Sequence, residues 1–341
     1  MIWIRADANH MIGSGHVMRC LSIAGELKKL GEKVCFLTAD EEPLPLLKAR
    51  GQEFLVLHSD YRNPEEELER LEELLKEHRP DFFLADSYYV TGAYLEGVRR
   101  LVPAGYLDDL GRDFGANLLI NYNLFAGDFT YEKVPGDRRL LGVEYVPLRE
   151  EFSGVRYLVR ERASRVLVTT GGSDEYNLAG QLLEKALADP PASELEYWVV
   201  SGAYNQHLEN LENMAARHPN VRIYSNVNNM QQLMKECDIA VSAGGSTLYE
   251  LSAVGVPTVC FSFVENQERI VECFREKGLS CCAGNYCTQG TDMLDGITDS
   301  IVRLKEDAGL RRSFSEKMRS LVDGQGAARI AERLAAGRRD A

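Results

Sequence analysis

Residues 1–31 read MIWIRADANHMIGSGHVMRCLSIAGELKKLG, and this stretch predicts a strand, a turn and a helix in succession. The apolar run Trp3–Ala6 is typical of a buried strand. From Val17 onward, apolar residues recur at helical spacing until Gly31, which is a natural helix C-cap. The turn follows the carboxyl end of a strand, where ligands lie in open parallel sheets. The stretch therefore predicts a βα unit with a ligand site at its turn.

The same alternation of short apolar runs and helical patterns continues along the chain, with a helix expected over Pro64–His78. Further strands are expected at Val34–Thr38, Phe54–Leu57, Phe82–Ala85, Gly105–Leu107, Leu118–Ile120, Arg165–Thr169, Tyr197–Val200, Val221–Tyr224, Ile239–Val241 and Thr258–Phe261. Such alternation favours an α/β fold with parallel sheets. A polar, charge-rich seam near Leu148–Arg165 divides the pattern, so we expect two doubly wound domains with a cleft between them.

The composition limits the possible partners. The 341 residues carry a net charge of −13, with 39 Lys and Arg against 52 Asp and Glu. This charge argues against nucleic acid and anionic membranes, which bind broad basic surfaces. No apolar run approaches the roughly 20 residues of a membrane span, and the first residues do not resemble a signal peptide. The eight cysteines show neither a CxxC nor zinc-like spacing. We expect a cytoplasmic protein with reduced thiols, no metal site and no membrane anchor.

The turn before the first helix carries Gly13, Gly15 and His16. Position 18 is Met where a dinucleotide-binding fingerprint has its third glycine, and no P-loop occurs in the chain. The two glycines allow a tight turn that brings backbone close to a ligand. His16 opens the helix at the mouth of the sheet, where an imidazole can serve as a general base. A histidine that only hydrogen-bonds a loop carbonyl is the alternative.

Two more glycine turns follow strands in the second half, Gly171-Gly172-Ser173 and Gly244-Gly245-Ser246-Thr247. Each precedes a predicted helix. Bare backbone amides and hydroxyl donors at a helix N-terminus suit a pyrophosphate without the help of lysine. Ordinary loop and cap chemistry is the alternative interpretation of both turns.

Polar side chains beside these turns predict contacts to a sugar. Glu250 lies one helical turn beyond Ser246 and Thr247, where a carboxylate can accept two hydrogen bonds from a ribose diol. Asn266 and Gln267 follow another strand, and their amides suit the amides and hydroxyls of a sugar. In the first half, the pair Asp108-Asp109 ends a strand, and we expect it to cap a loop.

Several motifs, in this order, resemble the PseG family, the UDP-2,4-diacetamido-2,4,6-trideoxy-β-L-altropyranose hydrolases of pseudaminic acid biosynthesis. They are RAD at 5–7, IGSGHVMRC at 12–20, GGSD at 171–174, GGSTLYE at 244–250 and ENQ at 265–267. Spore-coat polysaccharide proteins of the SpsG type resemble the same family. The GGSTLYEL segment is shared more widely, with MurG-like glycosyltransferases.

The resemblance implies a GT-B fold, with a Rossmann-like domain at 1–150, a UDP-binding domain at 160–325 and a helix at 326–341 that crosses back to the first domain. In this family, water releases UDP by cleaving the bond between C1 of the sugar and oxygen. His16 then matches the proposed general base, and Tyr88 matches an aromatic near the sugar pocket. The nucleotide-binding motifs contain Gly171, Gly172, Gly244, Gly245, Ser246 and Glu250, with uracil near Tyr224–Met230, while Asn266 faces the sugar.

We therefore expect a metal-independent UDP-sugar hydrolase that acts as a monomer without a cofactor. Its substrate contacts are expected at Gly13, Gly15, Tyr88, Gly171, Gly172, Ser173, Gly244, Gly245, Ser246, Thr247, Glu250, Asn266 and Gln267. Two alternatives remain. One is a MurG-like glycosyltransferase with the same nucleotide site, and the other is a non-catalytic protein that binds nucleotide sugars.

Overall fold

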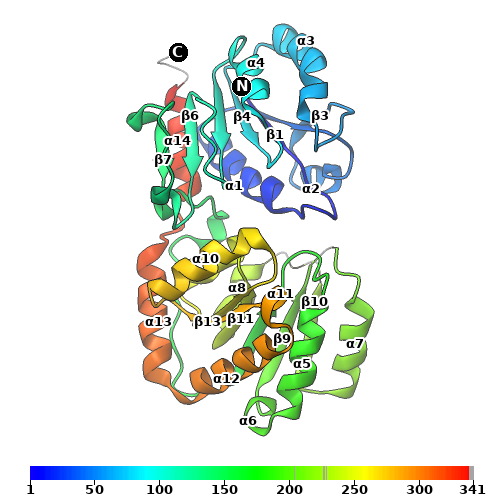
Figure 1. Ribbon diagram of the computed structural model, residues 1–341, viewed down its shortest axis with the longest axis vertical. Helices are drawn as coiled ribbons and strands as arrows, with labels where there is room; N and C mark the ends of the chain where they lie inside the picture. Colours follow the sequence, from blue (N-terminus) through cyan, green and yellow to red (C-terminus); the bar gives the residue numbers. More distant parts are fainter. Residues whose placement is uncertain (203, 226, 228, 338–341) are drawn as a thin grey trace. The chain divides into compact units, whose positions relative to one another are not determined.

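The computed structural model describes residues 1–202, 204–225, 227 and 229–337, apart from the side chain of Asn266 (Figure 1). The chain divides into two compact units. The first contains Met1–Glu150 together with the segment from Gly324 onward, and the second contains Glu151–Asp323. None of the helices built from the described residues is both long and apolar enough to span a membrane.

The first unit is built on a seven-stranded parallel sheet with the order β3-β2-β1-β4-β5-β6-β7. Its strands are β1 Ile2–Ala6, β2 Val34–Thr38, β3 Glu53–Val56, β4 Phe82–Asp86, β5 Ala104–Leu107, β6 Leu118–Asn121 and β7 Arg139–Leu141. Its helices are α1 Gly15–Lys29, α2 Leu44–Ala49, α3 Leu68–His78, α4 Gly92–Arg99 and α14 Gly326–Gly337. Short 3-10 turns lie at Pro64–Glu67, Ala126–Asp128, Gly136–Arg138, Val143–Tyr145 and Glu150–Phe152.

The central strands of this sheet are buried along their whole length, as in β1, β2 and β4. Helices cover both faces of such a sheet, which is why the strand sequences are mostly apolar runs rather than alternating ones. The helix α14, although last in the sequence, packs against α1 within this unit (Figure 1). Gly326 begins α14 against the backbone of Val146, where a Cβ would overlap the carbonyl oxygen.

The described residues of the second unit form a six-stranded parallel sheet with the order β10-β9-β8-β11-β12-β13. Its strands are β8 Arg165–Thr169, β9 Glu196–Ser201, β10 Val221–Ser225, β11 Ile239–Ala243, β12 Thr258–Ser262 and β13 Cys281–Asn285. Its helices are α5 Leu178–Ala188, α6 Pro190–Ser193, α7 Leu208–Arg217, α8 Met230–Glu236, α9 Ser246–Val254, α10 Glu265–Glu276, α11 Tyr286–Gln289, α12 Asp292–Glu306 and α13 Ala308–Leu321.

Both sheets reverse their strand order at one point. In the first sheet the reversal lies between β1 and β4, and in the second it lies between β8 and β11. The loops that leave neighbouring strands at such a point run to opposite faces of the sheet and leave a crevice at the carboxyl ends, where ligands bind. The topology therefore places the turn before α1 and both predicted anion turns of the second unit at these points.

The doubly wound α/β prediction is confirmed, and every strand predicted from the sequence is present. The predicted helix over Pro64–His78 is a 3-10 turn at Pro64–Glu67 followed by α3. Two strands were not predicted. The strand β7 has only three residues, and β13 reads CCAGN, a sequence with weak strand propensity.

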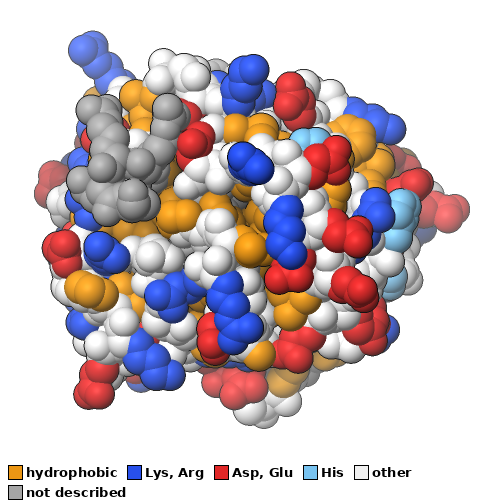
Figure 2. All heavy atoms as spheres, turned by 90° about the horizontal axis from the view of Figure 1, so that it is seen from above, with side chains coloured by type: hydrophobic (Ala, Val, Ile, Leu, Met, Phe, Trp, Pro, Cys, Tyr) orange, Lys and Arg blue, Asp and Glu red, His pale blue; other side chains and the backbone are white. Residues whose placement is uncertain are grey.

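Acidic and basic side chains are intermixed on the face of the molecule seen in Figure 2, with hydrophobic side chains between them. Although the net charge is −13, this face does not carry a continuous acidic patch.

Candidate active site

His16 and Asp86 meet at the point where the first sheet reverses its order. His16 lies in the first turn of α1, and Asp86 is the last residue of β4. The Nδ1 atom of His16 lies 2.6 Å from Oδ1 of Asp86. Both side chains are almost fully buried, with exposed fractions of 5% and 0%. The Tyr88 ring and the imidazole form a T-shaped pair, with the ring centroids 4.4 Å apart and an angle of 81° between the ring planes. The imidazole is therefore held in one orientation by a carboxylate and an aromatic ring.

Asp86 receives its partners from one face of α1. Arg19 donates from Nε to Oδ2 (2.7 Å) and from Nη2 to Oδ1 (2.5 Å), and the thiol of Cys20 lies 3.3 Å from Oδ2. Residues 16, 19 and 20 are spaced i, i+3 and i+4, so the helix presents all three side chains to the same carboxylate. Burial alone would raise the pKa of Asp86, but the charges of Arg19 and His16 and their hydrogen bonds hold it well below its ordinary value.

The protonation of Asp86 assigns the tautomer of His16. An ionised carboxylate only accepts hydrogen bonds, so Nδ1 of His16 carries the proton that it donates to Asp86. The Nε2 atom then keeps its lone pair and can accept a proton. Nη2 of Arg19 lies 3.0 Å from Nδ1, and this is a contact between two donors that are both directed at Oδ1 of Asp86.

Arg19 links this pair to two further loops. Its Nη1 donates to Oδ2 of Asp109 (2.8 Å), which follows β5, and to the hydroxyl of Tyr122 (2.6 Å), which follows β6. Oδ1 of Asp109 also accepts from the side-chain amide of Asn123 (2.9 Å). The prediction for Asp108-Asp109 is thus half right. Asp108 caps its loop by accepting from the amides at positions 110, 111 and 112, whereas Asp109 binds Arg19.

The loop before α1 is closed by its own hydrogen bonds. Gly13 has a φ of +70° and donates its N–H to the carbonyl of Asn9 (2.8 Å). The side chain of Asn9 accepts from the amides of Met11 and Ile12. Ser14 precedes α1 without capping it through its side chain, and Gly15 is exposed. Gly13 is therefore fixed as a turn residue, while the first amides of α1 have no side-chain cap.

In the second unit, the turn after β8 is exposed at Gly171 and Gly172 and half-buried at Ser173. Gly171 has a φ of +97°. Asp174 closes the turn, because its carboxylate accepts from the amides of Leu178 (2.7 Å) and Ala179 (3.1 Å) in the first turn of α5. The N-terminal end of α5 is thus occupied by a protein carboxylate. The exposed turn at Gly171 and Gly172 is the part of this segment that we assign to a ligand.

The turn after β11 leaves its helix uncapped. The N-cap residue of α9 is Gly245, which has no side chain and so does not cap the helix. Ser246 is exposed, Thr247 is half-buried, and Glu250 lies half-buried on the next turn. The first amides of a helix have no partner within it and carry partial positive charge. The prediction that Gly244 offers a bare amide is wrong, because its N–H donates to the carbonyl of Phe261 (2.8 Å).

The remaining predicted residues lie at the start of α10 and near β10. Gln267 is half-buried, and its side-chain carbonyl accepts from the amide of Phe263 (3.1 Å), which leaves its NH₂ group as a donor. The side chain of Asn266 lies outside the described part of the structure. In the segment predicted to lie near uracil, Tyr224 packs on Trp198, with the ring centroids 5.2 Å apart, and residues 226 and 228 are not described.

The sequence alone did not identify the partners of His16. Arg19 and Cys20 share the helix face of His16, and this spacing is a signal that could have been used. The strand order of the sheet brings together Asp86, Asp109 and Tyr122, and this order could not be predicted from the sequence. Among the described residues, no three His, Cys, Asp or Glu side chains are grouped as metal ligands.

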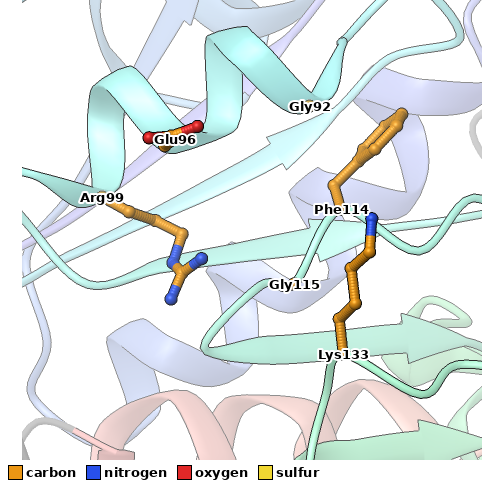
Figure 3. Close-up of a pocket in the computed structure, with 6 residues that line it drawn as sticks. All are labelled: Gly92, Glu96, Arg99, Phe114, Gly115 and Lys133. Atoms are coloured by element: carbon orange, nitrogen blue, oxygen red, sulfur yellow. The ribbon is translucent and has the colours of Figure 1, made fainter.

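A separate pocket of about 510 Å³ lies on the first unit (Figure 3). It is lined by Gly92, Glu96, Arg99, Phe114, Gly115 and Lys133. Figure 3 shows Glu96 and Arg99 on α4 and Lys133 on the opposite side of the pocket. None of the predicted site residues lines it.

Residues 166–323 match the glycosyltransferase family 28 C-terminal domain. Over 342 aligned residues, the chain is 25% identical to the spore coat polysaccharide biosynthesis protein SpsG of Bacillus subtilis, with 96% of each chain covered. It is 24% identical to the UDP-2,4-diacetamido-2,4,6-trideoxy-β-L-altropyranose hydrolase of Campylobacter jejuni, with 81% of this chain and 97% of the relative covered.

The fold is similar to that of MurG from Acinetobacter baumannii. The TM-score is 0.66 at 15% identity, and 98% of each chain is covered. This likeness, together with the two parallel sheets, identifies the GT-B fold that the family resemblance implied.

Proposed function

We propose that this protein is a hydrolase that releases UDP from a UDP-linked diacetamido-trideoxy sugar. The substrate named by the resemblance is UDP-2,4-diacetamido-2,4,6-trideoxy-β-L-altropyranose, an intermediate of pseudaminic-acid-type nonulosonate biosynthesis. The observation that carries the proposal is the buried contact of 2.6 Å between His16 Nδ1 and Asp86. It leaves Nε2 of His16 as a proton acceptor at the ligand end of the first sheet. The relative from Campylobacter jejuni supports the choice of substrate.

In this reaction the oxygen of a water molecule attacks C1 of the sugar. The bond between C1 and the phosphate oxygen breaks, and its electron pair stays on the oxygen of the departing UDP. The proton of the attacking water passes to Nε2 of His16. General-base catalysis of this kind contributes a factor of roughly 10²–10⁴ in rate. Asp86 stabilises the imidazolium that forms and keeps the proton of Nδ1 in place, as a buried carboxylate does in a catalytic triad.

The second unit supplies the site for the leaving group. The uncapped N-terminal end of α9, from Gly245 to Thr247, is suited to hold the charge of a diphosphate with amide and hydroxyl donors. The exposed turn at Gly171 and Gly172, with Ser173, adds backbone donors. Glu250, on the following turn of α9, accepts from the ribose hydroxyls.

The sugar contacts are assigned to three side chains. Tyr88 is half-buried and packs against His16, and this place beside the base is why we assign it to the sugar. Gln267 offers its free NH₂ group to an acetamido carbonyl. Asn266 is assigned to the sugar by resemblance alone.

A glycosyltransferase is the second candidate, favoured by the family 28 C-terminal domain match over residues 166–323. The same base would then take the proton of an acceptor hydroxyl instead of water, and the same site would hold UDP. A protein that only binds nucleotide sugars would not need a buried carboxylate to orient a histidine. The pair of His16 and Asp86 therefore argues for an enzyme.

The two enzymes are distinguished by incubation of the protein with UDP-linked diacetamido sugars in ¹⁸O-labelled water without an acceptor. A hydrolase that cleaves the C1–O bond releases unlabelled UDP and a sugar that carries the label. Label in the UDP would indicate attack at phosphorus and would exclude the proposed step. UDP release that requires an added acceptor would assign the protein as a transferase.

A further inference from the structure

We infer that Arg19 is a positioning residue that holds Asp86 in place for His16, and that Asp109 offsets its charge. This inference rests on the proposed role of His16 as the general base. Arg19 is 9% exposed, and four of its five N–H groups donate to Asp86, Asp109 and Tyr122, so its guanidinium is bound to protein groups rather than presented to a substrate. Its role must therefore be exerted through these neighbours.

The geometry explains why an arginine is used. Nε and Nη2 of Arg19 donate to the two different oxygens of Asp86, which fixes the plane of the carboxylate. That plane directs Oδ1 at Nδ1 of His16. Nη1 points to the other side and joins Asp109 and Tyr122. A lysine has one compact charge and cannot form this fork on Asp86 while it also reaches Asp109.

The charges explain why Asp109 is needed. In the proposed reaction His16 gains a positive charge. The guanidinium of Arg19, with Nη2 3.0 Å from Nδ1, repels that charge. Asp109 lies on the far side of the guanidinium and supplies a second negative charge. With neutral His16, the group of His16, Asp86, Arg19 and Asp109 carries a formal charge of −1, since one positive and two negative charges are present. When His16 takes the proton of water, the charge of the group becomes zero.

Arg19→Ala and Arg19→Lys test the inference. We expect kcat to fall by about 10–100-fold, by analogy with the loss of hydrogen-bonded partners that orient metal-binding side chains, with KM nearly unchanged. Guanidinium ion at non-denaturing concentration should restore part of the activity of Arg19→Ala, because it can refill the fork on Asp86. Arg139→Lys is the matched control, since Arg139 is an arginine of the same unit that donates to the carbonyl of Val134. It should keep wild-type kcat and gain nothing from guanidinium.

A second measurement does not depend on turnover. Two-bond ¹⁵N–¹H spectra of the histidine rings report which nitrogen carries the proton, and the His16→Asn spectrum identifies the signals of His16 among the six histidines. The wild type should show the proton on Nδ1, and both Arg19 variants should show a mixture of tautomers. Asp109→Asn should keep the Nδ1 tautomer and lower kcat, because it removes only the balancing charge.

Folded Arg19 variants that retain the Nδ1 tautomer and wild-type kcat would overturn the inference while leaving the hydrolase intact. If the wild type hydrolyses no UDP-sugar, the proposed function fails, and the ring spectra still decide whether Arg19 orients His16. If Arg19→Ala does not fold, kcat and the tautomer of His16 measured on Arg19→Lys test the inference instead.

Discussion

Gly244, in the turn after β11, lies so close to Gln267 of α10 that a Cβ at position 244 would stand 2.8 Å from the Gln267 carbonyl oxygen. The same Cβ would lie 2.9 Å from a methyl group of Val271. The glycine is thus required for the close approach of two segments that we assign to the nucleotide and the sugar. Its contribution to the site is one of packing, because its amide is already bonded to Phe261.

Gly244→Ala is therefore expected to push α10 away from the turn. The free energy of unfolding of the second unit should fall by about 1–3 kcal/mol, as in other overpacked cores. Chemical denaturation followed by the fluorescence of Trp198, in a Trp3→Phe background, measures this loss. Gly245→Ala is the matched control, since a Cβ there meets nothing within 4 Å and the backbone is extended at φ 176°. Equal stability of the two variants would show that the contact with α10 relaxes freely.

Glu250→Ala should weaken UDP binding. Loss of hydrogen bonds from the ribose to a charged acceptor is expected to cost about 1.5–3 kcal/mol. Titration calorimetry with UDP measures the change, and Glu184→Ala, at an exposed position of α5, is the control. Unchanged affinity for UDP would remove Glu250 from the nucleotide site.

His16→Asn and Asp86→Asn should both abolish most turnover and leave the affinity for UDP nearly unchanged. The expected loss for His16→Asn is a factor of roughly 10²–10⁴ in kcat, because the general base is removed. UDP is assigned to the second unit, so its binding does not depend on this pair. His58→Asn is the control, since His58 is exposed and has a φ of +58°, a conformation that Asn tolerates. Wild-type kcat in His16→Asn would assign proton transfer to another group.

Turnover should persist in EDTA. The uncapped first turn of α9 offers partial positive charge and amide donors to the diphosphate, so a divalent cation is not required to neutralise it. Initial rates of UDP release with EDTA and with added magnesium measure this. A loss of most activity in EDTA that magnesium restores would contradict the assignment of α9 as the anion site.

Most of the fold could be predicted because the buried strands are continuous apolar runs and the helices are amphipathic. The failures have physical causes. The three residues of β7 are too few to form a recognisable run. In β13, Gly284 and Asn285 disfavour a strand, and pairing with β12 overrides that preference.

The candidate site was predictable only in part. Glycine turns after strands are local signals, and they predicted the ligand sites at His16 and at the start of α9. Asp86 ends β4, whereas Asp109 and Tyr122 follow β5 and β6. These residues meet Arg19 only because the three strands are neighbours in the sheet. Whether a turn amide is free is likewise a tertiary property, as the bond from Gly244 to Phe261 shows.

Asp86 gives the first unit a pH-dependent stability. Burial works to raise the pKa of its carboxyl, but the charges and hydrogen bonds of Arg19 and His16 outweigh burial and hold the pKa well below its ordinary value. In an unfolded chain the pKa of an aspartate is about 3.9. The unfolded state therefore binds this proton first as the pH falls. The stabilisation is fully present above about pH 4 and is lost progressively below it.

Asp86→Asn should remove the contribution of this carboxyl group to the change of the free energy of unfolding with pH. Below about pH 4 the free energy of unfolding of the wild type should fall faster than that of the variant, by up to about 1.4 kcal/mol per pH unit for one proton. The chain has two tryptophans, Trp3 in β1 and Trp198 in β9, so in a Trp198→Phe background the fluorescence of Trp3 reports the first unit. Asp137→Asn is the matched control, because it makes the same chemical change on an exposed carboxylate of that unit. If the free energy of unfolding changed equally with pH in the wild type and in Asp86→Asn, folding would not change the proton affinity of Asp86. The assignment of an ionised Asp86 as the partner of His16 would then be wrong.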